Sequence, residues 1–490
     1  MTNRRPNILK NYILNAILTS LNIVYPLITY PWVNRVLGPE KIGLIGWATS
    51  IASYFVLIAG LGIPIFGVRE IARFQNDDNR RRQVLGSLVG TSIVSSSLCA
   101  ALFIVLVSLS SEMSSELYLF SIISISIFIN AFSVDWFFMG VENYKFITIR
   151  SVVVKLITLI FLFSFVREEK DYVIFALISV VASSGANLIN IISLIRSGEL
   201  KRVRFFNVLL VAKKAGVLFL ISLSISVYMS GNITVLGYLA TKKEVGFFTT
   251  AFKMLQLSLS FLSALVGVLL PRLSNTYQTE DKDEFYRTFS KGLDGALRLA
   301  FPMFVGMWIL ADDIVQVIGG DEFAESVPIL RLLSPIVLVS GLSNFLTNLV
   351  FIATGQERRV LVASIVGGIL CIVMDVLFIP SWGGYGAALA FLIAEISILA
   401  FYGIIIESDF RTIVLKSLMG RYVFGVMTMG VAVYFVKEIP VNSVYSLIIS
   451  ILTGVIVYCT SMLVIKDKIT LELIDKVLKK EKLRQKASKY

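Results

Sequence analysis

The chain has 490 residues, of which 56% are hydrophobic and only 16% are charged, and its formal net charge is +12. A soluble fold needs a far more polar surface than this composition can supply. The chain contains no histidine, which excludes Ser-His-Asp triads, zinc sites built on imidazole and histidine proton relays. The sequence therefore predicts a membrane protein, and we expect neither a metal nor a cofactor.

Apolar stretches of spanning length follow one another along the whole chain. Each runs for about 20 residues, which favours transmembrane helices over the shorter alternating strands of a membrane barrel. We expect an all-α integral membrane fold with about fourteen transmembrane helices. The expected spans are 11–36, 42–66, 84–109, 117–139, 147–166, 172–195, 214–240, 246–270, 293–316, 327–354, 360–379, 384–406, 417–437 and 443–465.

Lysine and arginine crowd alternate loops between these spans, as the positive-inside rule requires of loops that stay in the cytoplasm. The main contributors are Arg4 and Arg5, Arg80 to Arg82, Lys201 to Arg204, Lys213 and Lys214, and the tail from Lys466. We therefore expect both termini in the cytoplasm, with anionic inner-leaflet lipid as a partner. A nucleic-acid partner is not expected, because no soluble basic domain with interleaved aromatic residues is present.

The last segment, 466–490, combines basic residues with Leu471, Ile474 and Leu478 at helical spacing. This pattern predicts a basic amphipathic tail on the cytoplasmic membrane surface. Anchoring to lipid is the first interpretation, and binding of a cytoplasmic glycosyltransferase is the alternative.

An internal duplication is indicated when the segment around Gly43 is aligned with that around Gly246. Ile42-Gly43 then falls on Val245-Gly246 and Arg69 on Arg272. Two pseudo-symmetric six-helix lobes fit this repeat, and parallel repeats favour a transporter that opens alternately to each side. The alternative is chance similarity between apolar blocks. The expected divisions are 1–213 and 214–416 for the lobes, 417–465 for two additional helices and 466–490 for the tail.

Charged residues inside the spans are the candidates for a polar path, because an ionised side chain at that depth costs about 2.5–3.5 kcal/mol. The deepest are Lys155, Lys253 and Glu395. An ammonium group there could pair with a phosphate as a point charge. The alternatives are snorkelling to the interface and an internal ion pair with a carboxylate such as Glu395.

Four arginines are further candidates for the substrate path. Arg35 lies near the outer end of the first span. Arg298 follows Asp294 by four residues, so mutual neutralisation on one helix face is the simpler reading. Arg69 and Arg272 are related by the repeat and lie at cytoplasmic helix ends, which suits a gate or an entry site but also simple anchoring by positive charge.

Asp375 and Glu395 are the candidates for proton or sodium coupling, since burial of a carboxyl favours its protonated form and links protonation to the transport cycle. Hydrogen bonding between helices is the alternative. Pro26 and Pro31 interrupt the first span and predict a bend, which would serve either as the hinge of a lateral gate or as a static kink.

Four stretches carry a resemblance to a known family: Tyr30 to Gly43, Gly67 to Arg73, Asp135 to Lys145, and Gly383 to Ala388. They resemble signatures of the bacterial oligosaccharide-lipid flippases of the polysaccharide transport family. That family is part of the multidrug, oligosaccharidyl-lipid and polysaccharide exporter superfamily, whose members are V-shaped bundles of two six-helix lobes.

The resemblance implies a transporter and not an enzyme. Its substrate would be an undecaprenyl-diphosphate-linked oligosaccharide for O-antigen or a related surface polysaccharide, moved across the bacterial inner membrane. A polysaccharide polymerase or glycosyltransferases would be its protein partners. A cation-coupled multidrug exporter of the same superfamily is the alternative, although deep lysines do not suit cationic drugs. A membrane-embedded polymerase or ligase is a third reading, and the short outer loops argue against it.

Overall fold

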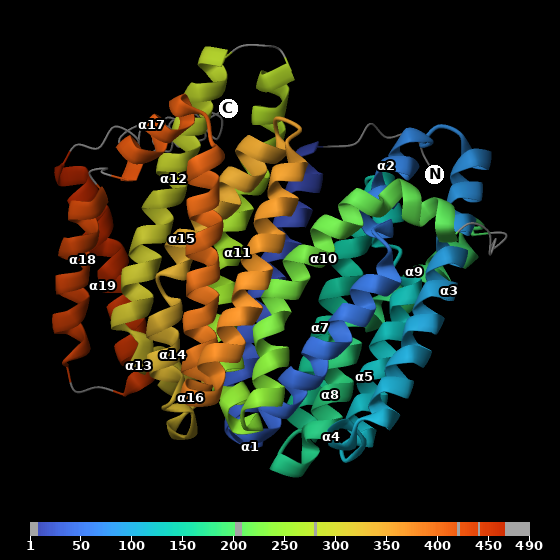
Figure 1. The fold of residues 1–490 in the computed structure, drawn as a ribbon, viewed down its shortest axis with the longest axis horizontal. Coiled ribbons are helices and arrows are strands. Elements are labelled where there is room, and N and C mark those ends of the chain that lie inside the picture. Colours follow the sequence, from blue (N-terminus) through green and yellow to red (C-terminus); the bar gives the residue numbers. More distant parts are fainter. Residues whose placement is uncertain (1–7, 201–207, 279–281, 419–421, 440–441, 466–490) are drawn as a thin grey trace, which may run out of the picture. The chain divides into compact units, whose positions relative to one another are not determined.

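The computed structural model describes residues 8–200, 208–278, 282–418, 422–439 and 442–465 (Figure 1). These residues form helices and connecting turns, and no strand occurs among them, which confirms the predicted all-α class. By length and composition, ten helices of the described chain could cross a membrane, or eleven if a bent pair counts as one span. The predicted amphipathic tail lies outside the described residues.

The helices of the first half are α1 (Ile8–Gly60), α2 (Ile63–Arg73), α3 (Asp78–Leu109), α4 (Ser111–Ser114), α5 (Leu117–Ile129), η1 (Asn130–Phe132), α6 (Asp135–Gly140), α7 (Tyr144–Phe165), η2 (Glu169–Asp171), α8 (Tyr172–Val180), η3 (Val181–Gly185) and α9 (Ala186–Arg196). Those of the second half are α10 (Val208–Leu239), α11 (Lys242–Gln278), α12 (Lys282–Ile309), α13 (Ala311–Ile318), η4 (Asp321–Phe323), α14 (Ser326–Leu333), α15 (Ile336–Leu346), η5 (Thr347–Ile352), α16 (Glu357–Ile405), α17 (Ser408–Leu418), α18 (Tyr422–Lys437) and α19 (Ser443–Val464). Of the η segments, η3 and η5 are π-helical and the others are 3₁₀ turns.

The two longest helices, α1 and α16, each contain two of the predicted spans and bend sharply at a glycine. The backbone leaves the helical region at Gly38 (φ 69°, ψ 172°) in α1 and at Gly383 (φ 52°, ψ −131°) in α16. Positive φ is easily accessible only to glycine, so each glycine permits the chain to turn back without a loop. The Gly384 N–H then donates to the Glu244 carboxylate at 2.8 Å, which holds the second bend in place.

The chain forms two compact units. The first contains residues 1–250, 318–323 and 358–394, and the second contains 251–317, 324–357 and 395–490. The predicted division into lobes at 213 and 416 stays a prediction.

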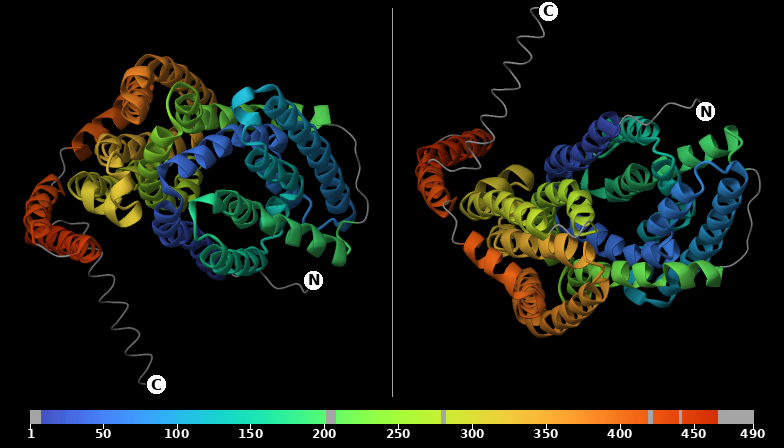
Figure 2. Two further views of the ribbon diagram at one scale, coloured as in Figure 1. Left: turned by 90° about the horizontal axis from the view of Figure 1, so that it is seen from below. Right: turned by 90° about the horizontal axis from the view of Figure 1, so that it is seen from above.

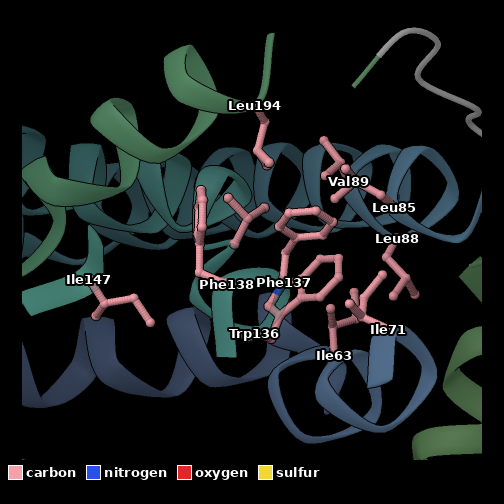
Figure 3. Close-up of a cluster of buried hydrophobic side chains, with 11 residues drawn as sticks. Ile63, Ile71, Leu85, Leu88, Val89, Trp136, Phe137, Phe138, Ile147 and Leu194 are labelled. Atoms are coloured by element: carbon pink, nitrogen blue, oxygen red, sulfur yellow. The ribbon is translucent and has the colours of Figure 1, made fainter. Parts of the chain in front are cut away.

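The first unit has an apolar core where α2, α3, α6, α7 and α9 converge. Figure 3 shows its side chains, among them Trp136, Phe137 and Phe138 of α6. A Cβ atom on Gly67 of α2 would lie 2.5 Å from the Trp136 ring, so glycine is what allows the indole to lie flat on α2. Gly140 admits Ile71 in the same way. Close helix contact at small residues is a general device of membrane proteins.

In the second unit, α18 and α19 pack on each other and against α12, as the two further views show (Figure 2). The contact buries Val426, Met429 and Val433 of α18 against Leu310. Lys437 reinforces it, because its Nζ donates to the Asp312 carboxylate at 2.5 Å and to the Ile309 carbonyl at 3.2 Å. The other faces of α18 and α19 expose apolar side chains, as lipid-facing helices do.

Candidate functional site

Lys155 of α7 lies against α1, where its partners are neutral. Its Nζ donates to Asn22 Oδ1 at 2.5 Å and lies 5.3 Å from the centroid of the Tyr25 ring. The described residues supply no carboxylate to this ammonium. A positive charge at membrane depth with only dipolar partners favours an anion as its further partner. The structure thus gives the contacts of Lys155, which the sequence places in a span. Its role in transport stays a prediction.

Further polar contacts continue along the same pair of helices. The Tyr25 hydroxyl donates to Thr158 Oγ1 at 3.2 Å, and Trp32 Nε1 donates to the Val166 carbonyl at 2.9 Å. Pro26 and Pro31 lie between these contacts inside α1, which stays helical through both. The sharp break comes later, at Gly38. The hinge role of the two prolines stays a prediction.

Asp375 of α16 is fully buried in the first unit, with 0% of its surface exposed. Neither carboxylate oxygen has a hydrogen-bond partner among the described residues. One turn earlier, Cys371 donates to Asn232 Oδ1 at 3.1 Å, and Asn232 Nδ2 donates to the Ala387 carbonyl at 3.0 Å. Tyr54 of α1 lies close enough for an electrostatic interaction with Asp375. An ionised carboxylate without partners is very costly in such a place, so the group requires a proton or a cation.

Glu395, the second predicted coupling residue, is also buried and lies in the second unit. It interacts with other groups of the protein. Tyr402, two turns further along α16, is close enough to interact with it electrostatically.

The remaining predicted residues lie in separate surroundings. Lys253 Nζ donates to Gln256 Oε1 at 3.5 Å, and the Arg298 guanidinium lies 5.9 Å from the centroid of the Tyr422 ring. Arg35 is exposed, and its side chain would lie 3.6 Å from a Cβ atom on Gly320. Arg69 is exposed on α2. The side chain of Arg272 lies outside what the structure describes.

The sequence missed a polar network around Asp135, whose side chain is 37% exposed. Arg150 of α7 is 4% exposed, and its Nη2 donates to Asp135 Oδ1 at 2.5 Å. Asn190 Nδ2 donates to the same oxygen at 2.6 Å, and Arg150 Nη1 donates to the Ala186 carbonyl just after η3 at 2.8 Å. The network ties α6, α7 and α9 together. Its signal in the sequence was an arginine and an acid near the same end of neighbouring spans.

The sequence also missed a pair of amides at the end of α15. Asn344 and Asn348 are four residues apart, and Asn348 Nδ2 donates to both the carbonyl and the side-chain oxygen of Asn344 at 3.0 Å. Thr347 Oγ1 donates to the Tyr402 hydroxyl at 3.0 Å beside them. Two amides one turn apart within an apolar span were the available signal.

Comparison with known families settles the class of this chain. A family model described as "Polysaccharide biosynthesis protein" matches residues 8–277. The chain belongs to this family. The match confirms the family resemblance, and three of the four signature stretches lie within it.

Relatives of this polysaccharide biosynthesis protein include the "Putative O-antigen transporter" of Escherichia coli strain K12. The two are 21% identical over 397 residues, which cover 81% of this chain and 95% of the relative. The "Probable low-salt glycan biosynthesis flippase Agl15" of Haloferax volcanii is 22% identical over 47% of this chain and 48% of its own length.

Among solved structures, the fold is similar to "Lipid II flippase MurJ, inward closed conformation", with a TM-score of 0.66 and 16% identity, over 92% of this chain and all of that one. It is also similar to a multidrug resistance MATE family transporter of the MOP superfamily in an inward-facing conformation. That match has a TM-score of 0.62 and 14% identity, over 82% of this chain and 97% of the other. Both likenesses concern the fold alone.

Proposed function

We propose that this protein is a lipid-linked oligosaccharide flippase. It moves an undecaprenyl-diphosphate-linked repeat unit, of O-antigen or a related surface polysaccharide, to the outer leaflet of the bacterial inner membrane. Membership of the polysaccharide biosynthesis family supports this, as do relatives named as an O-antigen transporter and a glycan flippase. The protein is accordingly a transporter and not an enzyme.

The environment of Lys155 is the observation that carries the proposal. A sugar-diphosphate headgroup cannot cross hydrocarbon unaided, because each polar group without a partner costs several kcal/mol there. The ammonium at Lys155, held by Asn22 and Tyr25, offers a positive charge inside a span. In our proposal the diphosphate pairs with this ammonium during passage, and Lys253, Arg35, Arg298, Arg69 and Arg272 are further contacts on its path.

For the topology we propose fourteen crossings, arranged as two six-helix lobes plus α18 and α19, with both termini in the cytoplasm. The bends at Gly38 and Gly383, which divide α1 and α16 into two helices each, support this number. The lobes alternate access to the two sides. Anionic lipid on the cytoplasmic side and a polymerase or glycosyltransferase are the partners this arrangement suits.

We further propose that Asp375 carries the coupling proton or sodium ion, with Glu395 as a second candidate. The absence of a hydrogen-bond partner for Asp375 within the described chain supports this assignment. A group that needs a proton or cation in one state and exchanges it in another can link transport to an ion gradient.

The Lys155 site is tested by binding measurements on the purified, membrane-reconstituted protein. Charge-assisted hydrogen bonds contribute about 1.5–3 kcal/mol, so Lys155→Gln should weaken binding of undecaprenyl diphosphate about ten- to hundredfold. Lys170→Gln is the matched control, because Lys170 is 78% exposed and outside the span core.

Equal binding by Lys155→Gln and the unaltered protein would contradict the cation role. The multidrug alternative is tested in the same preparation. Transport of cationic dyes without transport of the lipid-linked oligosaccharide would favour the exporter.

A further inference from the structure

The span formed by α14, α15 and η5 is among the most enclosed in the protein. Of its most apolar window, 61% is buried, compared with 17% for the lipid-facing helix α19. Within α15 and η5, all of whose residues the structure describes, Asn344 is the only residue that is exposed. A span turned toward lipid would expose a row of apolar residues. In α15 and η5 the exposed residue is instead an amide whose two chain neighbours, Ser343 and Phe345, are buried. We call this exposed position the opening.

The Asn344 amide is held in a fixed orientation by its neighbour. Its Oδ1 accepts a hydrogen bond from Asn348 at 3.0 Å, while its Nδ2 has no partner within the described part of the chain. Two N–H donors and one further lone pair of Oδ1 are therefore available at the opening. One turn earlier on the same helix face, Ser340 is buried and its hydroxyl also lacks a partner among the described residues.

The turn that follows Asn344 is wide and braced from one side. η5 is a π-helix, and the Ala353 N–H donates to the Asn348 carbonyl at 3.2 Å across it. π-turns inside α-helices occur frequently at functional sites. Tyr402 of α16 holds this one, because its hydroxyl accepts from Thr347 and its ring lies 4.8 Å from that of Phe351.

We infer that Asn344 is a contact for the saccharide part of the substrate. This inference rests on the proposed flippase function and deepens it. A sugar hydroxyl both donates and accepts hydrogen bonds, which is what a free amide edge offers, whereas a diphosphate would require a cation. In this assignment Asn344 recognises sugar hydroxyls, and Asn348 is a positioning residue that fixes the Asn344 amide.

The test compares two probes on the full-length protein in lipid nanodiscs. One is sugar-free undecaprenyl diphosphate, and the other is the lipid-linked oligosaccharide purified from cells that make this protein. Asn344→Leu removes the amide and with it the hydrogen bonds to the sugar hydroxyls. It should therefore weaken binding of the oligosaccharide-bearing lipid by at least about tenfold and leave the sugar-free lipid unchanged. Asn348→Ala should reduce the same preference about threefold.

Two controls keep the outcomes separate. Thr460→Val changes an exposed polar residue on α19, whose hydroxyl bonds only its own helix, and should alter neither affinity. Asn344→Ala replaces Asn344→Leu if the larger side chain prevents folding. A loss shared equally by both lipids, or no loss for the oligosaccharide-bearing lipid, would overturn the saccharide contact and leave water as the occupant of the opening.

The two proposals fail in different ways. If Lys155→Gln leaves both affinities unchanged while Asn344→Leu weakens only the oligosaccharide-bearing lipid, the diphosphate site is wrong and the saccharide contact stands. If neither lipid binds the unaltered protein, the flippase function itself is wrong, and the saccharide contact is overturned with it.

Discussion

Two regions differ in whether residues of the family signature form them. One is the apolar core of the first unit around α2 and α6, called here the α2–α6 core; the other is the π-helical turn η5 that follows α15, called here the α15–η5 turn. The core contains two of the stretches that resemble the family signature, yet its residues serve packing: Trp136 lies on Gly67, and Ile71 on Gly140. The turn lies in none of those stretches, yet it exposes a single oriented amide in an enclosed span. Signature residues here specify how helices fit together, and isolated polar residues provide the chemistry.

The two carboxylates Asp135 and Asp375 follow the same division. Asp135, within a signature stretch, has two donors, Arg150 and Asn190. Asp375, outside the signature stretches, has no hydrogen-bond partner in the described chain. Buried polar groups are normally satisfied, so a satisfied carboxylate indicates structure and an unsatisfied one indicates a ligand or a proton.

The largest expected effect is on the α2–α6 core. Trp136→Ala removes a side chain that is 2% exposed and should lower the free energy of unfolding by roughly 3–5 kcal/mol. Trp382→Ala is the matched control, because Trp382 is 52% exposed and loses far less packing. Thermal unfolding in detergent measures both. If the two variants were equally stable, the signature stretch would not be serving packing.

The environments of Asp135 and Asp375 should respond in opposite ways to substitution. Arg150→Gln leaves the Asp135 carboxylate without its charged donor and should cost about 1–3 kcal/mol of stability. Asp375→Asn removes a group that has no such partner to lose. It should leave stability nearly unchanged and reduce gradient-driven transport by about tenfold or more, since an amide does not exchange a proton at neutral pH.

Transport by Asp375→Asn is measured in proteoliposomes with an imposed proton or sodium gradient. Transport that still follows the gradient in this variant would remove Asp375 from the coupling mechanism and turn attention to Glu395. Destabilisation as large as that of Arg150→Gln would show that Asp375 has a structural partner.

Much of the fold could be predicted from the sequence, because span length and loop charge are local properties. The expected spans break between 36 and 42 and between 379 and 384, where Gly38 and Gly383 lie. That each break is a bend at one glycine inside a continuous helix was not predicted, since the φ of that glycine is set by the two helices it joins. The position of Lys155 within a span was visible in the sequence. Its neutral partners, Asn22 and Tyr25, were not, because they come from a helix more than 100 residues away.

The amide at Asn344 was missed for a related reason. An asparagine in an apolar stretch has the same appearance in a sequence whether its side chain bonds a helix backbone or faces an opening. Asn130 illustrates the first case, since its Nδ2 donates to the Val56 carbonyl at 3.1 Å. Only the burial of the residues around Asn344 distinguishes the two.

Access of water to Asn344 gives the next prediction. In a Cys459→Ser background, the thiol of Asn344→Cys should react with a charged thiol reagent at least about tenfold faster than that of Thr460→Cys on α19. Thiolates react only where water admits them, and the native Cys99 and Cys371 are buried. Equal rates at the two positions would mean that the opening faces lipid, and the contrast between the two regions would lose its basis.

The smallest expected effect concerns Gly383, which opens the last signature stretch. Gly383 and Gly355 both have positive φ, 52° and 75°, which disfavours side-chain-bearing residues, so alanine at either position should cost about 1–3 kcal/mol. Only Gly383 has a neighbour: a Cβ there would lie 2.7 Å from Glu244 Oε2, the atom that accepts from Gly384 N–H, whereas nothing lies within 4 Å at Gly355. Gly383→Ala should therefore lower the free energy of unfolding by about 1 kcal/mol more than Gly355→Ala, because one hydrogen bond contributes about that much.

If the signature specifies packing, transport per folded molecule should be the same for both variants. A loss of lipid-linked oligosaccharide binding by Gly383→Ala at unchanged stability would instead assign this signature glycine to the substrate path.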